Sequence, residues 1–378
     1  MKKYFILTAL AVVALAACTK IETNEPVVNV DEPVLFSAYS GRSATKAAPI
    51  ADVATLASQG GFGVFAYYTE NSTYAPASSP INFMYNQHLT STDSGANWTY
   101  SPIKYWPNND AEHSNGATTT DRLSFFAYAP WVDPTAYPAA GITNVPAKTG
   151  TGDPIVTYTV ATNPANSVDF LWSDANNKDL TKQSVTGKVN FTFKHALTRL
   201  EFVVRGVFDS TTENDTDVDS ATKIFVNSLD ITTTEKIPAS GKFNLNTGVW
   251  SEKTGETTLA IAAANIPDAL KTGGTGVTKT EVSLLKANEY FMFIPNDAAQ
   301  TYNFKINYTV VTEDAALNGG KSQVVNEITK SASIKFEAGK AYKIKLDLGM
   351  TTVKISAEVA TWGTVDDNNI VWLPVNNA

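Results

Sequence analysis

The only cysteine of this 378-residue chain, Cys18, stands where its thiol could be acylated. Two lysines lie near the N-terminus, and the apolar segment at residues 4–13 is too short to span a membrane as a stable helix. Leucine and two alanines then lead into Cys18. This order is typical of a bacterial lipoprotein signal, where the chain is cut before the cysteine and the cysteine receives two or more fatty acids. We therefore predict a signal peptide over residues 1–17 and a lipidated tether over residues 18–26; a plain secretory signal with an incidental cysteine is the alternative.

The composition excludes several classes of protein. Hydrophobic residues make up 43% of the chain and charged residues 17%, an ordinary balance for a globular protein that buries a core. The net charge is −8 and no basic run follows the two N-terminal lysines, so nucleic acid is not an expected partner. Because the chain has one cysteine, neither an intrachain disulfide nor a cysteine-rich metal site can form.

The sequence lacks the usual catalytic and metal-binding patterns. His88, His113 and His195 form neither a metalloprotease motif nor a spaced set of metal ligands. The glycine-rich run at residues 60–63 precedes a predicted strand, whereas a phosphate-binding loop opens a helix. No two carboxylates are marked as a glycosidase pair. We expect no enzymatic activity, cofactor or metal, and we expect His195, at the join of two strands, to be a hydrogen-bonded structural side chain.

The first predicted strand of the mature chain has one apolar face. Its apolar residues share one parity, the two-residue period of a half-buried strand, and are Val28, Val30, Val34, Phe36 and Ala38. Glu32 and Pro33 interrupt this run and predict a bulge or an edge position, because proline cannot donate a ladder hydrogen bond. A loop with Arg42 and Lys46 follows, and residues 50–56 are expected to form a short helical turn.

Short apolar strands continue through the rest of the chain. They are expected at residues 64–68, 123–129, 189–193, 200–204, 224–229, 290–294, 302–310, 331–336 and 341–348. Their spacing, with turn residues between them and few helical periods, predicts an all-β protein of two β-sandwich domains in tandem. The aromatic cluster of Trp98, Tyr100, Tyr105 and Trp106 could stack on a sugar, but its place within strand-like segments favours a role in the core.

Several motifs in both halves of the chain follow one another in a characteristic order. In the N-terminal half they are Thr-Lys-Ala at residues 45–47, Gly-Phe-Gly-Val-Phe-Ala-Tyr-Tyr at 61–68 and Lys-Tyr-Trp-Pro at 104–107. In the C-terminal half they are Phe-Thr-Phe-Lys-His-Ala-Leu-Thr-Arg-Leu-Glu-Phe at 191–202, Gly-Lys-Phe-Asn at 241–244 with Trp250, Phe-Glu-Ala-Gly-Lys-Ala-Tyr at 336–342, and Val-Lys-Ile-Ser-Ala-Glu-Val at 353–359 with Trp362 and Gly363. With the lipoprotein signal before them, these motifs resemble the fimbrillin family over nearly the whole chain.

The resemblance implies a subunit of type V fimbriae, the lipoprotein-derived pili of anaerobic Gram-negative bacteria. Such a subunit has two transthyretin-like β-sandwich domains and is exported as a lipid-anchored precursor. In the family, an arginine-specific surface protease cuts the loop after the first strand, and that strand leaves. A strand of another subunit, usually the C-terminal one, then fills the open groove and joins the subunits by main-chain pairing.

Two peptide bonds of this chain are candidates for the proteolytic cleavage that the resemblance implies. Arg42 and Ser43 lie just beyond the first strand, in a Ser-Gly-Arg-Ser loop that a protease could enter. Lys46 and Ala47 form the alternative bond. Either cation could instead be an ordinary solvated loop residue.

The candidate donor strand is the apolar tail after Gly363. Ile370 and Trp372 lie on one face of an extended chain, and Val371, Leu373 and Val375 lie on the other. A tail of this kind is an aggregation hazard if it has no groove to enter. Burial of all five side chains would contribute on the order of 10 kcal/mol before ordering costs. The alternative is that the tail forms the last strand of its own domain.

The expected organisation follows from these parts. An N-terminal sandwich covers residues 27–184, with residues 27–42 as a removable strand that buries Val28, Val30, Val34 and Phe36; a C-terminal sandwich covers 185–363, and the donor tail covers 364–378. The expected partners are other fimbrial subunits, an arginine- or lysine-specific surface protease and, before the cut, the lipid of the outer membrane. The expected function is that of a structural subunit of an extracellular fimbrium that supports adhesion. A surface glycan-binding or adhesin lipoprotein that does not polymerise is the alternative.

Overall fold

The computed structural model describes residues 32–40, 50, 52–107, 120–173, 175–207, 221–233 and 235–361. Regular structure in these parts is almost entirely β-strand, which confirms the all-β prediction. The helical elements in these parts are short and comprise α1 (Val53–Ser58) and the 3-10 turns η1 (Pro164–Asn166), η2 (Ala175–Asn177), η3 (Lys182–Ser184) and η4 (Asp268–Leu270).

The strands of the described residues form four sheets. The first sheet consists, in order, of β1 (Leu35–Ser40), β8 (Lys188–His195), β7 (Leu171–Ser173), β4 (Leu123–Ala129), β2 (Phe62–Tyr68) and β3 (Met84–Leu89). The second consists of β12 (Val249–Thr254), β11 (Ser240–Asn244), β6 (Ile155–Thr159) and β5 (Gly141–Asn144). The third consists of β14 (Val282–Ser283), β9 (Thr198–Gly206), β18 (Lys340–Leu348) and β19 (Val353–Thr361), with β15 (Phe291–Phe293) also paired to β9. The fourth consists of β13 (Leu259–Ile261), β10 (Thr222–Thr233), β16 (Gln300–Glu313) and β17 (Lys321–Ile334).

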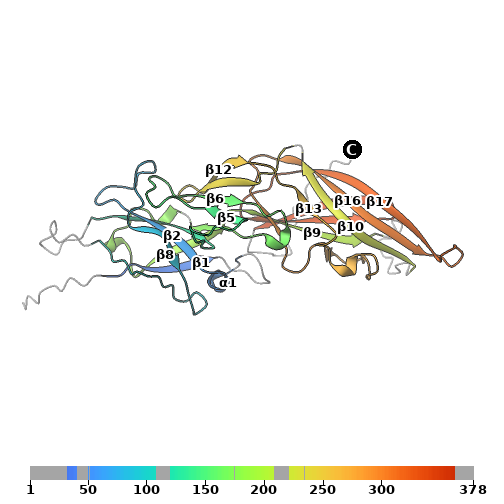
Figure 1. Ribbon diagram of the computed structural model, residues 1–378, viewed down its shortest axis with the longest axis horizontal. Helices are drawn as coiled ribbons and strands as arrows, with labels where there is room; N and C mark the ends of the chain where they lie inside the picture. Colours follow the sequence, from blue (N-terminus) through green and yellow to red (C-terminus); the bar gives the residue numbers. More distant parts are fainter. Residues whose placement is uncertain are drawn as a thin grey trace, which may run out of the picture.

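The molecule is elongated, with the first and second sheets towards one end and the third and fourth towards the other (Figure 1). Tyr158 of β6 stacks on Phe170, which directly precedes β7, with ring centroids 5.9 Å apart. In the other half, Phe202 of β9 meets Phe304 of β16 across the core at 6.2 Å. Packing of one sheet face on another is the arrangement of a β-sandwich.

The first sheet is covered on both faces, so β2 and β4 are buried along almost their whole length. Phe65 and Tyr128 belong to the larger hydrophobic cluster, which also contains residues of the second sheet. Phe62 and Phe125 point into a smaller cluster, which is closed by Leu56 of α1 and by buried rings from the loop at residues 98–106. Next to the edge strand β1 the pattern changes. There β8 buries Val189, Phe191 and Phe193, and the side chains between them are exposed.

Strand pairing crosses residue 185 in both directions. β8 pairs with β1 and β7 of the first sheet. The hairpin of β11 and β12 follows β10 of the fourth sheet in the chain, yet β11 pairs with β6 of the second sheet. The two ends of the molecule are therefore joined by strands that pair across residue 185, as well as by the continuous chain.

Most predicted strands are confirmed. Those at 64–68, 123–129, 189–193, 200–204, 224–229, 302–310 and 341–348 lie within β2, β4, β8, β9, β10, β16 and β18, and 290–294 contains β15. The strand expected at 331–336 is in fact β17, which begins at Lys321 and ends at Ile334. Its first half is exposed and largely polar, so a search for apolar runs does not find it. The helical turn is also displaced, because Asp52 caps α1 by accepting a 2.7 Å hydrogen bond from the Thr55 N–H.

Candidate functional site

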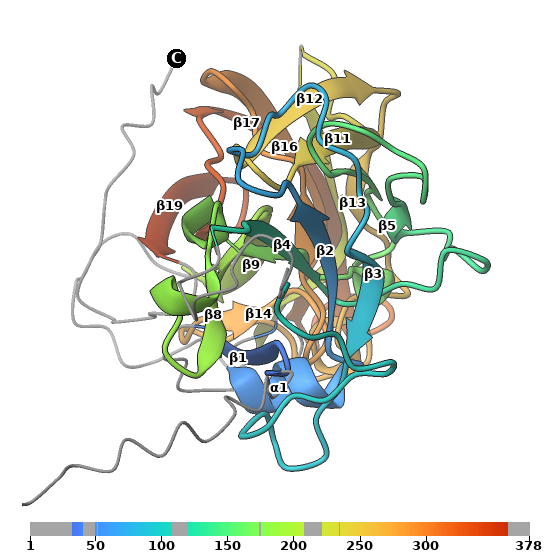
Figure 2. The ribbon, with the colours of Figure 1, turned by 90° about the vertical axis from the view of Figure 1, so that its left-hand side faces the viewer.

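β1 is the edge strand of the first sheet. It runs parallel to β8, from Leu35 beside Lys188 to Ser40 beside Phe193. Figure 2 shows β1 with α1 beside it, next to β8. A strand that is paired along one flank and in parallel has fewer main-chain bonds to break than a central strand.

The residues just before β1 pair with a different segment. The Val34 N–H donates to the Lys104 carbonyl at 2.9 Å, and the Trp106 N–H donates to the Glu32 carbonyl at 2.9 Å. Pro33 lies between these bonds, in an isolated bridge with Tyr105. The edge position predicted from Pro33 is thus confirmed.

Phe36 fills an aromatic pocket beneath β1 and is only 1% exposed. Its ring centroid lies 5.5 Å from that of Tyr100, 5.6 Å from that of Phe125 and 5.6 Å from that of Phe191. Two of these contacts are edge-on and the third is stacked, geometries that aromatic pairs prefer. Phe36 is therefore the main side-chain anchor of β1.

Tyr100 adds a polar contact to this pocket. Its hydroxyl donates to the carbonyl of Val34, a fully buried residue, at 2.7 Å. Burial raises the pKa of Tyr100, so the hydroxyl keeps its proton at neutral pH and remains a donor.

The opposite face of β1 is turned to solvent. Leu35 is exposed, Tyr39 is 56% exposed, and the Ser37 hydroxyl donates to the side-chain oxygen of Asn190 on β8. The groove under β1 therefore receives one face of a strand. Burial of Val34 and Phe36 contributes about 3 to 6 kcal/mol, as an upper estimate.

After the predicted loop at residues 41–49, the chain contacts the core at Ile50. The Ile50 N–H donates to Asp169 Oδ2 at 2.9 Å. Asp169 is 2% exposed and also contacts His195 Nδ1, at 3.0 Å from Oδ2 and 3.1 Å from Oδ1. The expected structural role of His195 is confirmed. The sequence does not predict that Asp169 is a buried hydrogen-bond acceptor, because an aspartate before an apolar strand resembles an ordinary loop residue.

Most residues predicted to act in processing and exchange lie outside the described residues. They are Cys18, Val28, Val30, Arg42, Ser43, Lys46, Ala47, Ile370, Val371, Trp372, Leu373 and Val375. The last described residue is Thr361, at the end of β19. Thr361 pairs with Lys340 of β18.

The predicted core role of the aromatic cluster is confirmed for Trp98, Tyr100 and Trp106, which are all buried. The prediction is wrong for Tyr105, which is 47% exposed.

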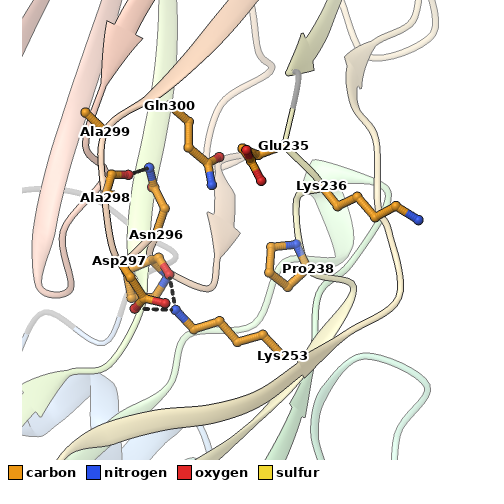
Figure 3. Close-up of a pocket in the computed structure, with 10 residues that line it drawn as sticks. Glu235, Lys236, Pro238, Lys253, Asn296, Asp297, Ala298, Ala299 and Gln300 are labelled. Carbon is orange, nitrogen blue, oxygen red and sulfur yellow. Dashed lines mark hydrogen bonds and ion pairs between the residues drawn. The ribbon is translucent and has the colours of Figure 1, made fainter.

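A separate pocket lies where the second sheet meets the other half of the molecule (Figure 3). Lys253 crosses it and donates to the Pro295 carbonyl at 2.9 Å and to Asp297 Oδ1 at 2.8 Å. The ten lining residues drawn there include charged, amide, alanine and proline side chains but no aromatic ring. This pocket therefore lacks a surface on which a sugar ring would stack.

Neither metal ligands nor a membrane helix were found where the structure is described. Within those ranges, no group of three or more histidine, cysteine, aspartate or glutamate residues could hold a metal ion. No helix in the same ranges is long and apolar enough to cross a membrane.

Comparisons with known proteins agree with the motifs. A family model described as fimbrillin-like matches residues 45–362, so the match begins after β1. The fimbrium subunit Fim1C of Phocaeicola vulgatus is 25% identical over 396 residues, which cover 96% of this chain and 97% of that protein. A fimbrial protein from Bacteroides vulgatus ATCC 8482 has a crystal structure with a TM-score of 0.67 to this one. The two are 22% identical, over 88% of this chain and 100% of that chain, and share the fold.

The match to the family model spans most of the sequence and nearly all of the described strands. The ordered motifs and the shared fold point to the same relationship. The chain belongs to the fimbrillin-like family.

Proposed function

We propose that this protein is a structural subunit of a cell-surface fimbria and that subunits join when β1 is exchanged for a strand of another subunit. The observation that carries the proposal is the place of β1, a one-sided edge strand that runs parallel to β8. The predicted loop with Arg42 and Lys46 follows β1 in the sequence. A cut in that loop separates β1 from the rest of the chain.

Loss of β1 would leave an acceptor groove. The main-chain groups of β8 would lose their partner, and the rings of Tyr100, Phe125 and Phe191 would lose Phe36. Exposed aromatic surface beside an unpaired strand edge favours the addition of a new strand. While β1 is in place, it prevents premature assembly.

The C-terminal tail is the proposed donor. Val34, Phe36 and Ala38 face the groove at a two-residue spacing, and Val371, Leu373 and Val375 have the same spacing. Ile370 and Trp372 would then face outward; the reverse orientation would bury Ile370 and Trp372 instead. In either case one face is buried, so the binding energy is smaller than burial of all five side chains would give. Durability of the fibre then depends on slow, cooperative strand release.

The proposed life cycle begins with export as a lipoprotein acylated at Cys18 in the outer membrane. A surface protease then cuts after Arg42, with Lys46 as the alternative, and the released subunit enters the extracellular fimbrium, where it supports adhesion. A glycan-binding protein that does not polymerise is less well supported, because Trp98 and Trp106 are buried and the described pocket has no aromatic lining.

A disulfide that locks β1 to β8 tests the exchange. Ser37 and Asn190 are register partners on adjacent strands, and their side chains touch, so S37C/N190C places two thiols within bonding range. Cells that produce the oxidised double variant should yield monomers, and a reductant should restore the ladder of polymers on gels.

The matched control is K343C/E358C, which locks β18 to β19 at another pair of register partners. This variant should polymerise with or without reductant. Polymerisation of the locked S37C/N190C protein at the level of the wild type would refute the exchange of β1.

A further inference from the structure

The carboxylate of Asp169 gathers donors from three separate parts of the chain. It accepts the Ile50 N–H at 2.9 Å, the N–H of its neighbour Phe170 at 2.8 Å, and a contact from His195 Nδ1 at 3.0 Å. His195 is the last residue of β8, and the Ala196 N–H donates to the Phe170 carbonyl at 2.9 Å, which holds the two segments together. A buried carboxylate with this many donors is well satisfied and costly to disturb.

Both the main chain and the side chain of Ile50 are held in place. Its side chain is 1% exposed, in the same cluster as Phe36 and Leu56. Two residues later, Asp52 caps α1, which places Leu56 in the core. The bond to Asp169 is thus a main-chain anchor that follows Arg42 and Lys46 in the chain.

All these partners lie on one side of the proposed cut. Ile50, Asp169, Phe170 and His195 follow both candidate cleavage bonds, whereas β1 precedes them. The main chain of β1 pairs instead with β8, and the main chain of Glu32 and Val34, just before β1, bonds to residues 104–106. Departure of β1 therefore leaves the contacts of Asp169 intact.

We propose that Asp169, oriented by His195, is a positioning residue that keeps Ile50 and α1 in place on the core after the cut releases β1. The inference rests on the proposed function, because it assigns a role in the cut subunit. A new chain end at Ser43 or Ala47 is free to fray. The hydrogen bond that Asp169 accepts from the Ile50 N–H limits this fraying, so α1 continues to cover the core while the groove under β1 opens.

Hydrogen exchange of residues 50–58 tests this role in the full chain before and after a cut with an arginine-specific protease. In D169N the Ile50 N–H loses a charged acceptor, so exchange over residues 50–58 of the cut chain should become about ten- to a hundredfold faster than in the wild type. Before the cut the same variant should differ much less, because the chain before Ile50 is still continuous with β1. Equal exchange in the cut D169N and wild-type chains would overturn the proposal.

Variants of His195 keep the test decisive if D169N fails to fold. H195N retains a side-chain N–H near the position of Nδ1 and should preserve protection, whereas H195L removes the donor and should lose it. D153N is the matched control, since Asp153 binds Tyr74, Asn244 and Asn246 far from Ile50 in the chain. Faster exchange of residues 50–58 in cut D153N, as large as in D169N, would mean general destabilisation and would also overturn the proposal.

Release of the β1 fragment is followed separately by size-exclusion chromatography of the cut wild type. If the fragment stays bound, the proposed exchange of β1 is refuted, but the effect of D169N on hydrogen exchange of the cut chain can still be measured. If the fragment leaves and D169N has no effect, the exchange stands and the role of Asp169 fails.

Discussion

Phe36 shows how one side chain connects β1 to the rest of the molecule. It contacts rings from three different segments, and among the residues of β1 it is the large side chain that is almost fully buried. Tyr39, three residues later on the opposite face, is mostly exposed. The two aromatics therefore allow a matched comparison within one strand.

We expect F36A to lower the free energy of unfolding of the uncut chain by about 3 kcal/mol or more, because it empties a buried aromatic site. Y39A should change it by less than about 0.5 kcal/mol. Urea unfolding measures both. After the cut and removal of the β1 fragment, the two variants and the wild type should have equal stability. A similar effect of F36A and Y39A on the uncut chain would contradict the assigned pocket.

At this scale the sequence predicts apolar side chains well and polar partners poorly. The parity of Val34 and Phe36 predicts their buried face, because side chains alternate along any strand. Asp169 could not be recognised, because its partners, Ile50 and His195, come from distant parts of the chain. Burial of a carboxylate depends on the fold and has no local signature.

At the scale of elements, the critical relationship is the parallel pairing of β1 with β8. The two-residue period predicts both strands, but it carries no information on which strands become neighbours. Residues 35–40 pair with residues 188–193, across most of the N-terminal half of the chain. The division expected at residue 185 separates these two strands, whereas the pairing joins them.

The tail provides a test at the same scale. Deletion of residues 364–378 should leave export and cutting of the subunit unchanged and should abolish its polymer ladder, because the acceptor groove receives no donor. A variant that keeps the full length of the tail but has Val371, Leu373 and Val375 replaced by serine should also fail to form the ladder. Ladders of normal length from the deletion variant would show that another segment joins the subunits.

At the scale of the whole molecule, the two hydrophobic clusters differ in their dependence on β1. The larger one includes residues of all four sheets, from Phe65 to Ala357. The smaller one contains Val34 and Phe36 and lies on the far face of the first sheet. Loss of β1 therefore disturbs the smaller cluster directly and leaves the larger one in place.

The continuity of the larger cluster predicts cooperative unfolding. The hairpin of β11 and β12 strengthens this expectation. Its Trp250 indole N–H donates to the Ala196 carbonyl at 2.9 Å, and the Trp250 ring packs on Phe170 and Phe243. We expect one calorimetric transition for the uncut chain and one, at lower temperature, for the cut chain without β1. Two separate transitions in the uncut chain would mean that its ends unfold independently.

The central claim is that β1 is absent from the assembled subunit. Fimbriae sheared from the cell surface can be separated into subunits and their N-terminal residue determined by sequencing and mass spectrometry. We predict a start at Ser43, or at Ala47 if the alternative bond is cut, in each case before the anchored Ile50. A polymer whose subunits begin at an acylated Cys18 and retain residues 32–40 would contradict it.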